Sequence, residues 1–228
     1  MYWFATCNFF ASKEKETAIV HRENVAGCRH SRPKRQMRRN INEPELVNRI
    51  IGGDSRAMKE LYDSHVGFLM AAASRYIPDD DDVKDVLQES FVKIYTSISK
   101  FNYRGDGSLR AWMTRIVVNE AIDFLDRNKR NGGVFAGEPA AEEIIEDEYD
   151  EPDAGQVPIE VIHDMIRRLP EGYRKVFNLY VFEGQGHREI AKKLNISEST
   201  SASQLHRAKA MLARQINGYK STLKEQRL

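Results

Sequence analysis

Cysteine is scarce in this sequence, and both cysteines lie within the first 28 residues. A disulfide framework is therefore excluded for the rest of the chain, which fits the reducing cytoplasm, where we expect the protein to reside. Cys7 and Cys28 could be combined with His21 and His30 as metal ligands, but their spacing matches no zinc pattern. We accordingly expect neither a metal nor a cofactor.

Long hydrophobic runs are also missing, since no apolar stretch approaches the roughly 20 residues that span a bilayer. The opening MYWFATCNFFA is apolar but brief, and no basic residue precedes it, so a signal peptide is not expected. Residues 1–40 carry nine basic and three acidic side chains and are predicted to form a disordered basic tail. The alternative is that the native protein starts at Met37, just before the first organised segment.

The net charge is only +1, but this average conceals strongly charged segments. Residues 131–157 hold nine acidic and no basic side chains, whereas residues 158–228 hold 13 basic and seven acidic ones. The acidic block lacks a helical stripe and contains Pro139 and Pro152, which predicts a flexible linker. The basic segment that follows indicates an anionic partner.

Alternating strand patterns of useful length are absent, and nearly every periodic segment has helical spacing. The segment 54–76 has a stripe of residues at spacings of three and four, which is formed by Met58, Leu61, Tyr62, His65, Val66, Leu69 and Met70. The fold class is predicted to be all-α, with two small helical domains at 41–130 and 158–220 joined by the acidic linker. Helices are predicted at 43–52, 54–76, 81–98, 108–128, 158–168, 171–182, 187–194 and about 198–220.

The segment from His187 to Leu212 has the pattern of a helix-turn-helix. Asn195 can adopt the left-handed conformation that ends a helix, and Ser197 is a natural N-cap for the next one. In this arrangement the second helix enters the major groove of DNA, and its first turns face the base edges. The alternative is an ordinary helical hairpin with a solvated basic face.

The first predicted domain carries two polar surfaces. Asp85, Gln88 and Glu89 share one face of the 81–98 helix, which suits a basic protein partner. The 108–128 helix has Ser108 as its expected N-cap. It presents arginine and asparagine side chains, and it follows the aromatic and basic loop FNYRGDGS. This combination suits stacking on and hydrogen bonding to unpaired bases.

Three motifs together resemble the extracytoplasmic-function sigma factors of bacterial RNA polymerase. They are D-x-x-Q-E-x-F in DDVKDVLQESFVKIYTSISKF, W-x-x-R-I-x-x-N in GSLRAWMTRIVVNEAIDFLDRNKR, and L-P-x-x-x-R-x-V-F before the helix-turn-helix. The resemblance covers about residues 43–130 and 158–216. It implies a protein that is not an enzyme, docks on core RNA polymerase, and directs promoter recognition and DNA melting in transcription initiation.

The resemblance also implies partners for individual residues. Asp85, Gln88 and Glu89 match the surface that docks on the coiled coil of the polymerase β′ subunit, and the β subunit is a further expected contact. Promoter DNA is the second partner, and an anti-sigma factor is usual in the family, whereas neither a small-molecule substrate nor membrane insertion is expected. The residues implied at the −10 element are Phe101, Tyr103, Arg104, Ser108, Arg115 and Asn119. Those implied at the −35 element are Arg188, Ser199, Thr200, Ala202, Ser203, Gln204, His206 and Arg207.

The recognition helix departs from the family pattern, because Ser201, Ala202 and Gln204 stand where Val, Lys and Arg are frequent. The absence of Val weakens the small core, and each missing phosphate contact flattens the salt dependence of DNA affinity by about one unit of slope. Gln204 could instead read adenine. Three other functions stay open on the sequence: a regulator that binds duplex DNA without polymerase, a helical enzyme with a metal at Asp79–Asp82, and a protein-binding scaffold.

Overall fold

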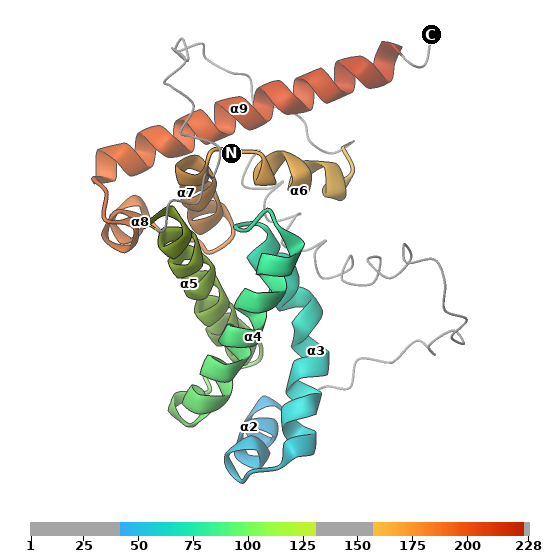
Figure 1. Ribbon diagram of the computed structural model, residues 1–228, viewed down its shortest axis with the longest axis vertical. Coiled ribbons are helices and arrows are strands. Elements are labelled where there is room, and N and C mark those ends of the chain that lie inside the picture. Colours follow the sequence, from blue (N-terminus) through green and yellow to red (C-terminus); the bar gives the residue numbers. More distant parts are fainter. Residues whose placement is uncertain (1–41, 131–156, 226–228) are drawn as a thin grey trace. The chain divides into compact units, whose positions relative to one another are not determined.

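The computed structural model describes residues 42–130 and 157–225, which form α-helices and one short 3-10 helix without any β-strand (Figure 1). The predicted all-α class is therefore confirmed for this part of the chain. None of its helices combines the length and apolar character that crossing a bilayer requires. The expected tail at 1–40 lies outside the described residues, as does the acidic linker except for Val157.

Packing divides the described residues into two compact units. The first contains residues 42–73 and 81–121, and the second contains residues 74–80, 122–130 and 157–225. This division falls inside the helix that begins at residue 108 rather than in the acidic block. The predicted domains at 41–130 and 158–220 therefore stay a prediction.

The first unit is built from four helices, of which the last extends into the second unit, and from the 3-10 turn. Its largest fully buried side chains are aliphatic or thioether groups, which come from α3, α4 and α5 and form its core. The elements are α2 (Glu43–Ile51), α3 (Ser55–Ser74), α4 (Asp80–Ser97), η1 (Ile98–Lys100) and α5 (Ser108–Arg130). The side chains are Leu61, Leu69, Ile94, Leu109 and Met113.

The start of α5 differs from the prediction. Ser108 is the first helical residue rather than the N-cap, because the carbonyl of Gly107 accepts the first hydrogen bond of the helix, from the Ala111 N–H at 3.0 Å. The Ser108 hydroxyl accepts a bond from the Arg104 N–H at 3.2 Å instead of capping α5. The acceptor at this helix end is the carboxylate of Glu43, which binds the Gly107 and Leu109 N–H groups.

Two members of the predicted apolar stripe in α3 are not in the core. Tyr62 is 44% exposed and Met70 is 39% exposed. The spacing of three and four residues was correct for Leu61 and Leu69, which are buried. The buried face of α3 is narrower than the predicted stripe, because it leaves out Tyr62 and Met70.

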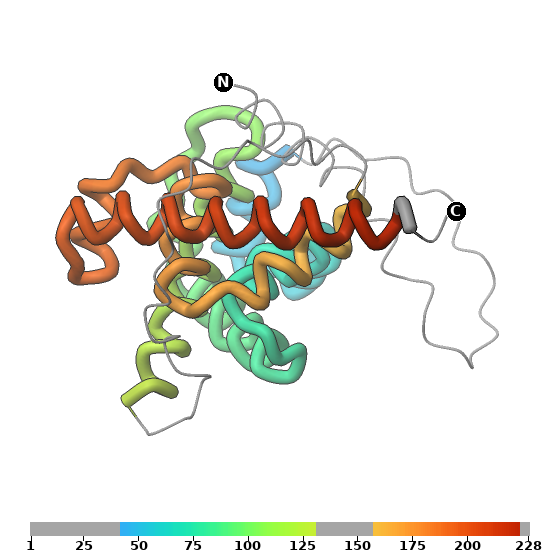
Figure 2. The backbone as a smooth tube through the Cα atoms, turned by 90° about the horizontal axis from the view of Figure 1, so that it is seen from above, coloured from blue at the N-terminus to red at the C-terminus, as the bar shows by residue number. Residues whose placement is uncertain are grey.

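The second unit contains α6 (Ile159–Arg167), α7 (Glu171–Val181), α8 (His187–Leu194) and α9 (Glu198–Glu225). Arg174 joins the first two of these, because its Nη1 donates to the carbonyls of Arg167 at 2.6 Å and Leu169 at 3.1 Å. Figure 2 shows α9 as one uninterrupted helix, which runs five residues beyond the predicted end at 220. With 28 residues, α9 is about 42 Å long.

Candidate functional site

The turn between α8 and α9 has the predicted helix-turn-helix geometry. Asn195 adopts the left-handed conformation with φ 53° and ψ 47°, and the Ile196 N–H donates to the Ala191 carbonyl at 3.0 Å. The Ser197 hydroxyl accepts a hydrogen bond from the Thr200 N–H at 2.9 Å. The predicted left-handed residue and the predicted N-cap are both confirmed, so α9 opens at Glu198, directly after its cap.

Ser201 is the inward-facing residue of this opening. It is fully buried, and its hydroxyl lies 3.0 Å from Nδ1 of His187, the first residue of α8. The His187 ring stacks on Tyr180 of α7 with centroids 5.0 Å apart. A hydrogen bond thus stands where the family pattern suggests apolar packing. Sequence reasoning missed His187, because no local periodicity connects two polar residues 14 positions apart.

The outward-facing residues of α8 and α9 carry most of the predicted −35 contacts. Gln204 is the exception: it is half-buried beside Gly172 of α7, where an added β-carbon would lie 3.3 Å from the Gln204 Nε2. Arg207 is exposed and donates to the Tyr173 hydroxyl at 3.3 Å. The predicted residues that are exposed are Arg188, Ser199, Thr200, Ala202, Ser203, His206 and Arg207.

The loop before α5 carries the predicted −10 residues. Phe101 is half-buried and packs against Trp112 with ring centroids 5.6 Å apart, so both rings act in packing. Tyr103 is exposed, and its hydroxyl donates to Asp106 Oδ1 at 2.8 Å, which raises the pKa of Tyr103. Arg104 is exposed as well, so the loop offers one aromatic ring and one guanidinium to solvent.

The exposed face of α5 continues this surface. Arg115 and Asn119 are exposed and stand four residues apart, so they project from the same face of the helix. The neighbouring Glu120 is almost fully buried and forms an ion pair with Lys93 of α4. Glu120 therefore links α5 to α4, whereas the neighbouring Asn119 is exposed.

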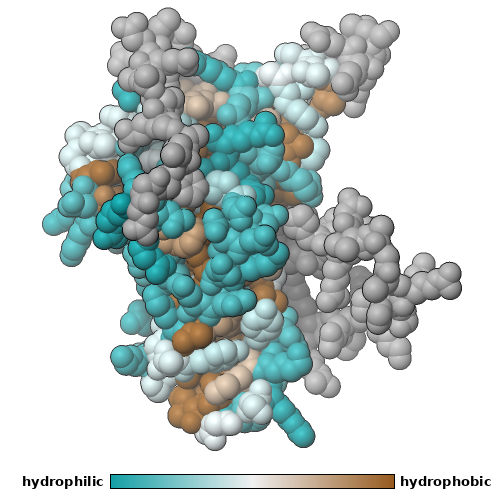
Figure 3. All heavy atoms as spheres, viewed as in Figure 1, coloured by the Kyte–Doolittle hydropathy of each residue, from teal (hydrophilic) through white to brown (hydrophobic). Residues whose placement is uncertain are grey.

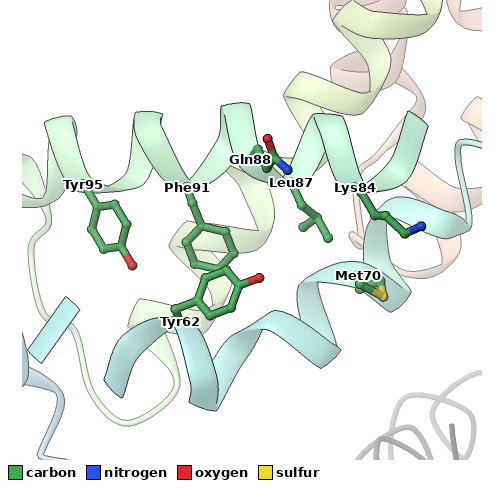
Figure 4. A pocket seen from close by; sticks show the side chains of 7 residues that line it. All are labelled: Tyr62, Met70, Lys84, Leu87, Gln88, Phe91 and Tyr95. Carbon is green, nitrogen blue, oxygen red and sulfur yellow. The ribbon is translucent and has the colours of Figure 1, made fainter. Parts of the chain in front are cut away.

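A groove between α3 and α4 lies beside the predicted polymerase-binding residues (Figure 4). Asp85, Gln88 and Glu89 are exposed on α4, and Gln88 also lines the groove. The groove has a volume of about 460 Å³. Tyr62 and Phe91 are two of its aromatic lining residues, and their ring centroids are 4.7 Å apart. The full lining is Tyr62, Met70, Lys84, Leu87, Gln88, Phe91 and Tyr95.

Sequence reasoning missed this groove, because helical spacing identifies an apolar stripe but does not show which of its members stay at the surface. One sequence feature indicates this groove. Aromatic side chains stand at the edges of the apolar stripes of α3 and α4, next to the acidic face of α4. Hydrophobic residues also interrupt the otherwise hydrophilic surface in Figure 3.

Within residues 42–130 and 157–225, no three His, Cys, Asp or Glu side chains are grouped to hold a metal ion, and this includes Asp79–Asp82.

Two family models match the segments of the chain that carry these surfaces. A family model described as Sigma-70 region 2 matches residues 61–131, and one described as Sigma-70, region 4 matches residues 159–212. The chain belongs to the sigma-70 family. The matched segments contain all the site residues predicted from the sequence. As a sigma factor, the protein is an initiation factor of transcription rather than an enzyme.

Curated relatives place this sigma factor in the extracytoplasmic-function subfamily, as predicted. It is 28% identical to the RNA polymerase sigma-H factor of Pseudomonas aeruginosa over 180 residues, which cover 73% of this chain and 90% of the relative. It is 28% identical to the ECF RNA polymerase sigma-E factor of Haemophilus influenzae over 195 residues, or 79% and 98% of the two chains. The sigma-E factor of Escherichia coli K12 is 29% identical over 181 residues, or 76% and 93%.

Two solved structures are similar in outline. CnrH in complex with the cytosolic domain of CnrY is 24% identical, with a TM-score of 0.40 over 76% of this chain and 96% of that one. RpoE in complex with the anti-sigma factor NepR from Bartonella quintana is 19% identical, with a TM-score of 0.45 over 70% and 96%.

Proposed function

We propose that this sigma factor docks on core RNA polymerase through α4, melts and holds the −10 element with the 101–108 loop and α5, and reads the −35 element with α9. The observation that carries the proposal is the solvent exposure of the residues implied at a partner. Of all residues implied at a partner, only Phe101, Ser108 and Gln204 are half-buried, and the others are exposed. The same motifs also supply buried core residues, so the exposed positions are those that the fold leaves for partners.

The α4 surface suits a helical protein partner. An apolar groove beside exposed acidic and amide side chains can accept the apolar face of a helix while its basic side chains pair with Asp85 and Glu89. The polymerase β′ coiled coil is the proposed occupant. We place the protein in the cytoplasm, where the polymerase acts, and an anti-sigma factor is a further proposed partner.

The α9 surface suits duplex DNA. Ser199, Thr200 and Ser203 are small and exposed, so the backbone at the start of α9 can approach the bases closely. Arg188 and Arg207 lie at the edges of this face and would contact phosphates, which positions the helix without reading sequence. Because Gln204 is packed beside Gly172, we assign base reading to the hydroxyl residues before it.

In vitro transcription with core polymerase and a promoter library tests the proposal. The wild-type protein should give promoter-specific products, and Gln88→Ala/Glu89→Ala should reduce them about 10-fold or more, because interface residues at a buried centre contribute most of the affinity. The control is Glu160→Ala/Asp164→Ala, which removes two exposed side chains from α6. Absence of any specific product with the wild-type protein would overturn the proposal. DNA binding without core enzyme would then favour a regulator of the helix-turn-helix type.

A further inference from the structure

The start of α5 is bound by a carboxylate from a distant part of the sequence. Glu43 Oε1 accepts a hydrogen bond from the Gly107 N–H at 2.9 Å, and Oε2 accepts one from the Leu109 N–H at 3.2 Å. N–H groups at a helix start have no partner within the helix, and this end of the helix dipole is positive. A carboxylate here makes charge-assisted hydrogen bonds, which are about twice as strong as neutral ones.

Glu43 is held in place because α2 is itself anchored. Three apolar side chains of α2 are buried, and Arg49 binds two acidic residues, one just before α3 and one within it. The Arg49 guanidinium donates to Asp54 Oδ2 through Nε at 3.0 Å and through Nη2 at 2.8 Å. Its Nη1 donates to Glu60 Oε2 at 3.1 Å. A pair of this kind restricts orientation as well as distance, so α2 carries Glu43 at a fixed position.

The loop that Glu43 reaches has few other restraints. Asn102, Tyr103 and Arg104 are exposed, and Gly105 and Gly107 adopt positive φ angles of 118° and 86°. The Arg104 N–H donates to the Ser108 hydroxyl at 3.2 Å, and that hydroxyl lies 3.5 Å from Glu43 Oε2. A chain of polar contacts thus runs from Glu43 through Ser108 to Arg104.

We infer that Glu43 is a positioning residue for reading of the −10 element. It fixes the loop that presents Tyr103 and Arg104 before DNA arrives, so that an unpaired base binds without the cost of ordering the loop. The inference rests on the proposed function, which assigns this loop to the −10 element. Glu43 lies before residues 61–131, which the family model matches, so the match assigns it no role.

Glu43→Ala and Glu45→Ala form a matched pair of variants. Both remove one acidic residue from the first turn of α2, but Glu45 is exposed and accepts a hydrogen bond from the neighbouring Asn42 side chain, at 3.4 Å. Amide hydrogen exchange on the full chain should show faster exchange of Gly107 and Leu109, by about 10-fold, in Glu43→Ala only. Glu43→Gln keeps one acceptor oxygen and should be intermediate, and it serves if the alanine variant does not fold.

The functional measurement is permanganate reactivity of thymines at the −10 element in complexes with core polymerase. Glu43→Ala should lower the rate of opening about 10-fold and reduce discrimination between −10 sequences, with polymerase affinity and −35 discrimination unchanged. Equal opening by Glu43→Ala and Glu45→Ala would overturn the inference, whatever their thermal stabilities. If the wild-type protein opens no promoter, the proposed function fails instead; the exchange result then still reports whether Glu43 holds the loop.

Discussion

Ser201 shows how one residue can change the way a small domain is held together. Its hydroxyl bonds to His187 inside the helix-turn-helix, in a position that has no access to solvent. The contact joins α8 to α9 across the turn. The hydrogen bond therefore compensates for the apolar packing that a valine would supply at this position.

A double-mutant cycle tests this bond. Ser201→Val should lower the free energy of unfolding by about 1–3 kcal/mol, because it leaves the partly buried His187 Nδ1 without its partner. Combining it with His187→Leu should recover part of that loss, with a coupling energy of about 0.5–3 kcal/mol. Urea unfolding of the four proteins measures the coupling. Additive effects would show that the two side chains act independently.

Residue-scale prediction succeeded where the cause is local. Ser197 and Asn195 were identified because a cap bonds three residues ahead and a left-handed residue follows directly on its helix. Glu43 was missed as the cap of α5 because 64 residues separate it from Gly107. No periodicity in the sequence encodes such a contact, which depends on how α2 packs.

At the scale of elements, α3 illustrates a buried titratable group within a helix. His65 is almost fully buried, and its Nδ1 lies 3.0 Å from the Leu61 carbonyl one turn earlier. Burial lowers the pKa of His65, and nearby Arg110 lowers it further, while the Leu61 carbonyl and Glu43 partly offset these effects. The folded protein therefore holds His65 neutral in a range where the unfolded chain binds a proton.

This difference makes the stability of α3 packing sensitive to acid. Below about pH 6.5 the unfolded state takes up the proton first, so the free energy of unfolding falls as pH decreases toward the lowered pKa. The slope contributed by one such group is at most about 1.4 kcal/mol per pH unit. His65→Gln should remove it, so the unfolding free energies of variant and wild type should converge or cross between about pH 7.5 and 5.5. Parallel curves would contradict the argument.

Element-scale prediction worked because the apolar stripes are strong. Helical spacing placed each of the eight α-helices in the described part of the chain, with most ends correct to within two or three residues, but it did not predict η1. The stripes did not reveal which apolar residues stay at the surface, as Tyr62 and Met70 show. That depends on the neighbouring helix α4, whose aromatic residues form the groove with them.

At the scale of the whole molecule, the proposed contacts lie on different helices and should be separable. Gln88→Ala/Glu89→Ala should weaken polymerase binding and leave binding to a −35 duplex unchanged, whereas Arg188→Ala/Arg207→Ala should do the reverse. The second pair should also reduce the slope of log affinity against log salt by about 0.9 for each phosphate that the variant no longer neutralises. Polymerase pull-down and salt titration of duplex binding check the two halves. Loss of both activities from either pair would indicate misfolding or one shared surface.

The contact between Glu43 and the start of α5 also has a consequence in time. A ribosome adds about 5–20 residues per second, so Gly107 emerges roughly 3–13 s after Glu43. During that interval the newly made α2 segment has no helix start to bind. Once Leu109 has left the ribosome, both N–H partners of the Glu43 carboxylate are available, and the 101–108 loop can take its final form before α9, the proposed −35 reader, has been translated.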